Sequence, residues 1–181
     1  MTCIVGIVDK ENNRVFIGGD SAGSNSSNIF IIKQPKVFRN GDFIMGGTSS
    51  FRMIQLLMYS FIPPQINNKE PHEYMCTDFI DAIRECFQKG GYMKKETEGD
   101  ERGGFFLVGF KDRLFKIEDD FQVSETLNGI DACGSGEDFA LGALTALEGF
   151  DIPTDQKVLK ALECAAFLSI GVSAPFKILA T

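Results

Sequence analysis

Residues 2–21 read TCIVGIVDKENNRVFIGGDS, and they contain the clearest structural pattern in the sequence. Two apolar runs, Cys3–Val8 and Val15–Gly19, flank a polar segment whose residues 11–13, Glu-Asn-Asn, are typical of a hairpin turn. The stretch therefore predicts a β-hairpin that ends at Asp20. In an antiparallel pair the end of the second strand returns to the start of the first, so the two ends of this stretch should lie side by side.

Apolar patterns continue along the rest of the chain. Short runs bounded by turn residues predict further strands, and apolar residues at helical spacing predict helices. Three segments are expected to lack regular structure: the polar Ser21–Asn28, the strand break at Gly46-Gly47, and the charged residues 94–101. The predicted strands are Ile29–Ile32, Lys36–Arg39, Phe43–Met45, Phe105–Phe110, Arg113–Glu118, Phe121–Val123, Asp131–Cys133 and Phe176–Leu179, and the predicted helices are 51–61, Glu73–Lys89, Glu137–Glu148 and Thr154–Leu168.

The order of these elements predicts an α+β fold. Strands come first, followed by two helices, more strands, two more helices and a last strand. Two antiparallel sheets that stack between two layers of helices would let each sheet bury one face on the other. We therefore predict a four-layer αββα sandwich, formed as a single domain by residues 1–181, a length usual for one domain.

The composition argues against several functional classes. The net charge of −7 does not fit a nucleic-acid surface, which needs clustered Lys and Arg. No stretch reaches the ~18 apolar residues of a membrane span, and the first residues lack the basic start of a signal peptide. Five cysteines without a CxxC pair are typical of free thiols and lack the spacing of a zinc site. We expect a cytoplasmic protein without nucleic-acid, membrane, metal or cofactor partners.

A single histidine, His72, limits the chemistry that is available. Ser-His-Asp and Cys-His mechanisms both need a histidine base. His72 follows Pro71 at the expected start of a helix, where a polar side chain is usually just solvated. If this protein is an enzyme, its base is therefore not an ordinary histidine.

Thr2 offers another kind of base. Methionine before a small residue is readily removed, and removal of Met1 would give Thr2 a free α-amine beside its own hydroxyl. An α-amine has an unperturbed pKa of about 7.7–8.0, so it can accept the hydroxyl proton near neutral pH. Thr2 is thus a candidate nucleophile that carries its own base.

Several further positions could complete a site around Thr2. Asp20 ends the hairpin, Lys36 begins a strand, Gly46-Gly47 leads to a helix N-terminus that could hold an oxyanion, and Ser135 lies in a Gly-Ser-Gly turn before another helix. Each also has a plain structural explanation. Asp20 could cap a turn, Lys36 could protect an edge strand from aggregation, and the glycines could serve backbone geometry alone.

In this order, the residues resemble the proteasome β-subunit and HslV family of N-terminal-nucleophile (Ntn) hydrolases. Thr2–Val8 is similar to the family's Thr-Thr-Ile-Val start, and Gly18–Ser21 to its Gly/Ala-Asp-Ser turn. Lys36 stands at the family's interval from the aspartate. Gly134–Gly136 followed by Phe139-Ala140 resembles the late Gly-Ser-Gly…Tyr-Ala signature. The resemblance spans nearly the whole chain.

The resemblance implies a role for each of the central residues. Thr2 would be the nucleophile of a threonine peptidase and its amine the general base. Lys36 would lower the pKa values of the Thr2 hydroxyl and amine, Asp20 would pair with Lys36 and orient it, and Ser135 would form a hydrogen bond near the amine. No metal or cofactor takes part in such a mechanism.

The resemblance also implies oxyanion donors and substrate contacts. Gly47 is the favoured oxyanion donor, and Ser49 is the alternative from an ungapped alignment. Met45 and Ile32 would form walls of an apolar substrate pocket, with Ser49 and Ser21 as further substrate contacts. Neither the Lys36 nor the Lys33 side chain is expected in the apolar core.

One departure from the family leaves a second function open. The family has a late aspartate near the nucleophile, and Phe167 stands in its place, with Ser169 as a partial substitute. The chain could thus be a catalytically silent subunit of a ring or shell, and a small-amide hydrolase with the same nucleophile is a third alternative. For the active form, the resemblance implies a stacked homo-oligomeric ring, peptide or unfolded-protein substrates and an ATP-dependent unfoldase.

Overall fold

The computed structural model describes residues 1–25, 28–93 and 103–181. The charged residues 94–101 that were predicted as a loop therefore lie outside the described part, as do residues 26–27 of the predicted polar loop.

Two antiparallel sheets form the centre of the molecule. In both sheets every neighbouring pair of strands runs antiparallel. The first sheet has the order β10 (Ile130–Cys133), β1 (Ile4–Asp9), β2 (Arg14–Gly19), β11 (Lys177–Ala180). The second has the order β5 (Val37–Asn40), β6 (Phe43–Gly47), β7 (Phe106–Phe110), β8 (Arg113–Ile117), β9 (Val123–Ser124).

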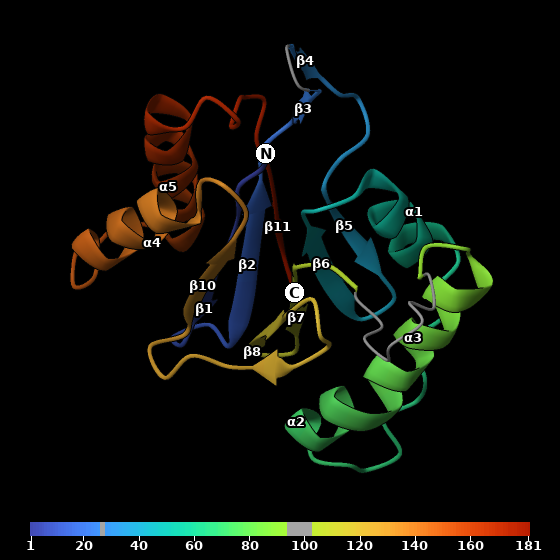
Figure 1. Cartoon of the computed structure of the whole chain (residues 1–181). Coiled ribbons are helices and arrows are strands. Elements are labelled where there is room, and N and C mark those ends of the chain that lie inside the picture. Colours follow the sequence, from blue (N-terminus) through green and yellow to red (C-terminus); the bar gives the residue numbers. More distant parts are fainter. Residues whose placement is uncertain (26–27, 94–102) are drawn as a thin grey trace.

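Helices cover the outer face of each sheet, so the predicted αββα sandwich is confirmed (Figure 1). On one side, α4 (Glu137–Ala146) and α5 (Thr154–Leu168) contact β1, β2 and β10. The other side carries α1 (Phe51–Tyr59) and α3 (Ile80–Lys89), and α2 (Pro71–Tyr74) leads into α3 through the π-helical segment η1 (Met75–Phe79). None of the helices in the described ranges is both long and apolar enough to cross a membrane.

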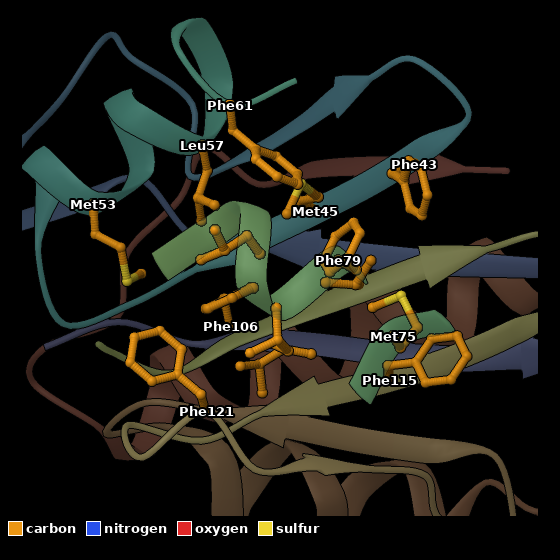
Figure 2. Packing of buried hydrophobic residues seen from close by; sticks show 14 of the residues in the cluster. Phe43, Met45, Met53, Leu57, Phe61, Met75, Phe79, Phe106, Phe115 and Phe121 are labelled. Atoms are coloured by element: carbon orange, nitrogen blue, oxygen red, sulfur yellow. The ribbon is translucent and has the colours of Figure 1, made fainter. Parts of the chain in front are cut away.

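Alternating side chains divide the apolar core into three layers. Successive residues of a strand point to opposite faces of the sheet. In β6, Ile44 therefore packs between the two sheets, whereas Phe43 and Met45 join the aromatic cluster under α1 and α3 (Figure 2). A third cluster lies between the first sheet and α4 and α5. β6 is thus buried on both faces, which fixes its register.

The predicted N-terminal hairpin is confirmed in detail. β1 pairs with β2 from Ile4 opposite Gly19 to Asp9 opposite Arg14. The backbone N–H of Asp20 donates to the carbonyl of Cys3 at 3.2 Å, which extends the ladder past the last strand residue. The two ends of the opening stretch therefore lie side by side.

Two local predictions from sequence are wrong. The strand does not break at Gly46-Gly47, because β6 continues through both glycines. A Cβ at Gly46 would lie 2.6 Å from Cγ2 of Ile4, so glycine is needed there to let the sheets stack. The predicted loop Ser21–Asn28 also contains a strand, β3 (Ala22–Ser24), which pairs with β4 (Ile29–Ile31).

Candidate active site

Thr2, Asp20 and Lys36 meet at one end of the stacked sheets. Thr2 precedes β1, Asp20 follows β2 and Lys36 precedes β5, so both sheets contribute. The Lys36 Nζ donates to Oγ1 of Thr2 at 2.8 Å and to Oδ1 of Asp20 at 2.7 Å. All three are buried, with exposed fractions of 5%, 2% and 1% in sequence order. As the hairpin predicts, Asp20 lies beside the start of the chain, and Lys36 joins it to Thr2.

The Asp20 carboxylate is held by backbone donors as well as by Lys36. Its Oδ1 also accepts from the N–H of Cys3 at 3.0 Å. Its Oδ2 accepts from the N–H of Ala22 at 2.8 Å and from that of Ser173 at 3.3 Å. Four donors therefore fix both oxygens, so the carboxylate can orient the ammonium group of Lys36 without rotating away.

Lys36 is fully buried, which differs from the expectation that its side chain lies outside the core. Burial lowers its pKa below the ordinary value of 10.5, and the neighbouring carboxylate of Asp20 offsets part of that effect. A positive charge at 2.8 Å from the Thr2 hydroxyl favours the deprotonated oxygen. A charge in this position is of the kind that would activate a hydroxyl as a nucleophile.

Ser135 contacts the backbone of Thr2 from the turn between β10 and α4. The Thr2 N–H donates to the Ser135 Oγ at 3.2 Å, and that hydroxyl is 3.3 Å from the Thr2 carbonyl oxygen. The Gly136 N–H donates to the same carbonyl at 3.2 Å. Gly134 has a φ of +102° and no room for a Cβ, which would lie 2.4 Å from the Thr2 oxygen. Only glycine lets this turn approach so closely.

Met1 is attached to Thr2 in this structure. The Thr2 hydroxyl donates to the Met1 carbonyl, and the Thr2 nitrogen is an amide. An amide nitrogen is not a base, so the Thr2 nitrogen could serve as a base only after removal of Met1. The hydroxyl, Lys36 and Ser135 are already close together before that step.

The favoured oxyanion donor, Gly47, does not fit that role in this structure. Its N–H donates to the Lys36 carbonyl at 3.1 Å and is therefore used inside the sheet. Ser49, the alternative, is exposed, and no described residue accepts a hydrogen bond from its N–H. Ser49 also has a φ of +68°, a strained value for a side chain other than glycine, which is often found at functional sites.

The predicted substrate contacts have different environments. Met45 is fully buried and points into the aromatic cluster beside Phe61, which does not fit a role in a substrate pocket (Figure 2). Ser21 follows Asp20, but its hydroxyl donates to the Pro175 carbonyl at 2.6 Å. Phe167, which replaces the family's late aspartate, is 89% exposed.

Other reactive side chains do not join this site. Burial raises the pKa of the Cys3 thiol to about 12, so it stays neutral next to Thr2. His72 lies on α2, 3.5 Å from the thiol of Cys76. In the described parts of the chain, no group of three or more His, Cys, Asp or Glu could hold a metal ion.

Sequence reasoning missed two residues beside the site. Ser173 reaches Asp20 from the segment after α5, and no pattern marks that approach. The hydroxyl of Thr48, a buried residue, lies 3.3 Å from the position that a Cβ on Gly134 would take. A signal for Thr48 existed: residues 48–50 are all hydroxyl residues, whereas the helix cap uses only Ser50.

No protein-family model and no curated protein sequence matches this chain. Solved structures do. BPH from Thiobacillus denitrificans superimposes with a TM-score of 0.80 at 19% identity, over 98% of this chain and 97% of that chain. This chain has the proteasome-type Ntn-hydrolase fold.

The same fold is shared by more distant solved structures. HslV from Trypanosoma brucei has a TM-score of 0.70 at 18% identity, over 99% of this chain and 98% of that chain. The Anbu complex from Pseudomonas aeruginosa, solved as a helical assembly, has a TM-score of 0.69 at 14% identity, over 99% and 81%. At these identities the likeness concerns the fold alone.

Proposed function

We propose that this protein is a threonine-type peptidase whose nucleophile is the hydroxyl of Thr2, released for catalysis by removal of Met1. One observation carries the proposal: the buried Lys36 ammonium donates to both the Thr2 hydroxyl and the Asp20 carboxylate. A buried ion pair is costly to build, and this one is aimed at a hydroxyl beside a future α-amine. The Ntn-hydrolase fold supports the same class of reaction.

The proposed reaction is an acyl transfer in two steps. The Thr2 oxygen attacks the carbonyl carbon of a peptide bond while its proton passes to the α-amine. The C–N bond breaks, the leaving nitrogen takes that proton, and the acyl group stays on the Thr2 oxygen as an ester. Water that is deprotonated by the amine then adds to the ester, the C–O bond breaks, and the hydroxyl is restored with the proton.

Ser49 is the oxyanion donor in this proposal. N–H groups of a strand alternate between its two neighbours, and Gly47 donates toward Lys36 while Thr48 donates to Phe105 at 3.0 Å. Ser49 follows the end of β6, and no described residue accepts a hydrogen bond from its N–H, so this donor is available to an oxyanion. Ser49 also lies next to Ser50, the N-cap of α1, where the helix dipole favours negative charge.

The proposal includes the partners implied by the family resemblance. Peptides or unfolded proteins would be the substrates, a stacked homo-oligomeric ring the working assembly, an ATP-dependent unfoldase a possible feeder, and the cytoplasm the location. The Thiobacillus denitrificans BPH structure with epoxomicin and the helical assembly of Anbu support substrate class and self-association, respectively. All five cysteines are free, as a reducing compartment would allow.

The decisive experiment tests the N-terminus and the nucleophile together. Mass spectrometry of the purified protein should show a chain without Met1, and incubation with epoxomicin should add one inhibitor mass at Thr2. A Thr2→Ala variant is the control and should stay unlabelled. Fully trimmed protein that epoxomicin leaves unmodified contradicts the proposal.

The same experiment separates the proposed peptidase from the silent ring or shell subunit. Phe167 at the position of the family's aspartate is the observation that keeps this alternative open. A silent subunit would assemble, as size-exclusion chromatography can show, yet would keep Met1 in every molecule. An active one would lose Met1 and hydrolyse peptides.

A further inference from the structure

The side chain of Met1 occupies a definite place on the protein. A Cβ on Gly171 would lie 2.2 Å from Cβ, 2.7 Å from Cγ and 2.8 Å from Sδ of Met1. Met1 therefore lies along the bare backbone of Gly171, in contact with it from Cβ to the sulfur. The other half of the Met1 surface is open to solvent. We call this place the Gly171 seat.

The segment that forms the seat is well anchored. Gly171 is buried in the turn after α5, and the Val172 N–H donates to the Ser169 carbonyl at 3.2 Å. Ser173 donates to the Asp20 carboxylate, so the same segment also holds the activating ion pair. Val172 packs against the Ser135 turn, because a Cβ on Gly136 would meet its Cγ2 at 2.9 Å. The seat is thus part of the rigid surroundings of Thr2.

The two reactive atoms of Thr2 face different walls. The oxygen faces Lys36, and the nitrogen faces Ser135 and carries Met1. When Met1 is gone, the amine on that nitrogen must hand its proton to the leaving nitrogen of the substrate. The leaving nitrogen must therefore come close to both the Thr2 oxygen and the Thr2 amine. The Met1 carbonyl oxygen, which accepts from the Thr2 hydroxyl and is joined to the Thr2 nitrogen through its carbon, lies in that region now. The Cα and side chain of the leaving residue then extend to where Met1 lies.

We infer that the Gly171 seat, vacated by Met1, binds the first residue on the leaving side of the peptide bond and favours a long, unbranched apolar side chain there. This inference rests on the proposed peptidase function. Close contact at the Met1 Cβ means that a β-branched residue would crowd Gly171, whereas Met lies flat on it. The open half of the seat gives the rest of the leaving chain a way out to solvent.

A peptide series with one variable residue tests the inference in the parent enzyme. The peptides share every residue before the cut and carry Met, Val or Gly immediately after it. Partial burial of a Met side chain should raise kcat/KM about tenfold over Gly, with Val between Gly and Met or below Gly. Equal rates for the Met and Gly peptides overturn the inference without any variant.

Gly171→Ala is the matched structural test. No left-handed φ is recorded for Gly171, so only space opposes alanine there. The methyl group should fill the seat and bring the Met-to-Gly ratio of kcat/KM close to one. Gly142→Ala, in α4 with nothing within 4 Å of the added Cβ, should keep the tenfold ratio.

The outcomes distinguish the seat from the proposed function. A Met preference that survives in folded Gly171→Ala overturns the seat but leaves the peptidase standing. Protein that neither cleaves the peptides nor reacts with epoxomicin overturns both. If Gly171→Ala does not fold, as circular dichroism would show, the peptide series in the parent decides alone.

Discussion

Two clusters of charged residues in this protein have opposite surroundings. Around Asp20 and Lys36, both partners are almost fully buried and the carboxylate accepts from three backbone N–H groups. Around Arg113, the guanidinium binds Glu70 and Glu125 near the surface, and the three side chains are partly open to solvent, with exposed fractions of 29%, 55% and 23%. The first cluster joins both sheets to the segment after α5, and the second joins β8 to surface loops.

The difference in burial determines how much free energy of unfolding is lost when one partner of the pair is removed. A buried ion pair has lost its hydration, so its stability depends on the partner charge and on every other hydrogen-bond donor around it. In a pair that solvent can reach, water replaces a lost partner at little cost in free energy. Removal of one partner from the buried cluster leaves a charge that nothing else compensates. The two clusters should therefore respond to matched substitutions by very different amounts.

The largest effect is expected for Asp20→Asn, which removes the charge that compensates Lys36. An uncompensated buried charge costs about 3–5 kcal/mol of unfolding free energy. Urea unfolding followed by circular dichroism measures the loss. A loss below about 1 kcal/mol would show that the buried cluster behaves like a surface pair, and the contrast between the two clusters would be abandoned.

Lys36→Ala should have its main effect on the reaction. A charge that shifts the Thr2 groups by two to three pKa units contributes about 3–4 kcal/mol, or a roughly 100- to 1000-fold change in rate. Because Lys36 is buried, the variant should also be less stable, so kcat/KM is measured well below its Tm. Lys33→Ala is the matched control, since Lys33 is exposed. Equal activity of the two variants would remove Lys36 from the mechanism.

The pH profile of kcat/KM should be bell-shaped. Activity rises with pH as the Thr2 amine becomes neutral, because only the neutral amine is a base. Activity falls again as Lys36 loses its charge, and burial places that loss below the ordinary pKa of 10.5. Lys33→Ala should keep the alkaline fall. A profile that stays flat up to pH 10.5 would mean that the Lys36 charge is not needed.

The smallest effect is expected for Glu125→Gln in the surface cluster. Pairs that solvent can reach contribute about 0–1 kcal/mol and are screened by salt, and both Arg113 and Glu125 are partly open to solvent. The unfolding free energy should drop by less than about 1 kcal/mol, and the difference from the parent should shrink as salt is added. A drop as large as that of Asp20→Asn would mean that exposure does not decide the energetics of these clusters.

Much of the fold follows from local patterns in the sequence. The hairpin is predictable because its two apolar runs and its turn lie within one stretch, and α5 is predictable because it starts after Pro153 and has a regular apolar stripe. Gly46-Gly47 misled the prediction because glycine weakens a strand in general. The reason for Gly46 is Ile4 on the facing sheet, which local reasoning does not see.

The candidate site could be predicted only in part for the same reason. Thr2, Asp20 and Lys36 stand in a recognisable order, and their contacts follow from strand ends that meet. The choice between Gly47 and Ser49 depends on which N–H is already paired, and the bond from the Gly47 N–H to the Lys36 carbonyl is a contact between separate segments that the sequence does not show. The contact of Ser173 joins positions 153 residues apart, and no local pattern reports it.

That long separation has a consequence for how the protein comes into being. The Asp20 carboxylate has all of its hydrogen bonds only after the segment that follows α5 has packed against it. Thr2, Asp20 and Lys36 are all synthesised before that segment. Contacts between distant parts of a chain form late in folding, because the loop between them must close first. A nascent chain that still lacks this segment contains Thr2, Asp20 and Lys36 but not the Ser173 donor to Asp20. The order of synthesis would thereby delay the proposed hydrolytic activity until the surrounding structure is in place.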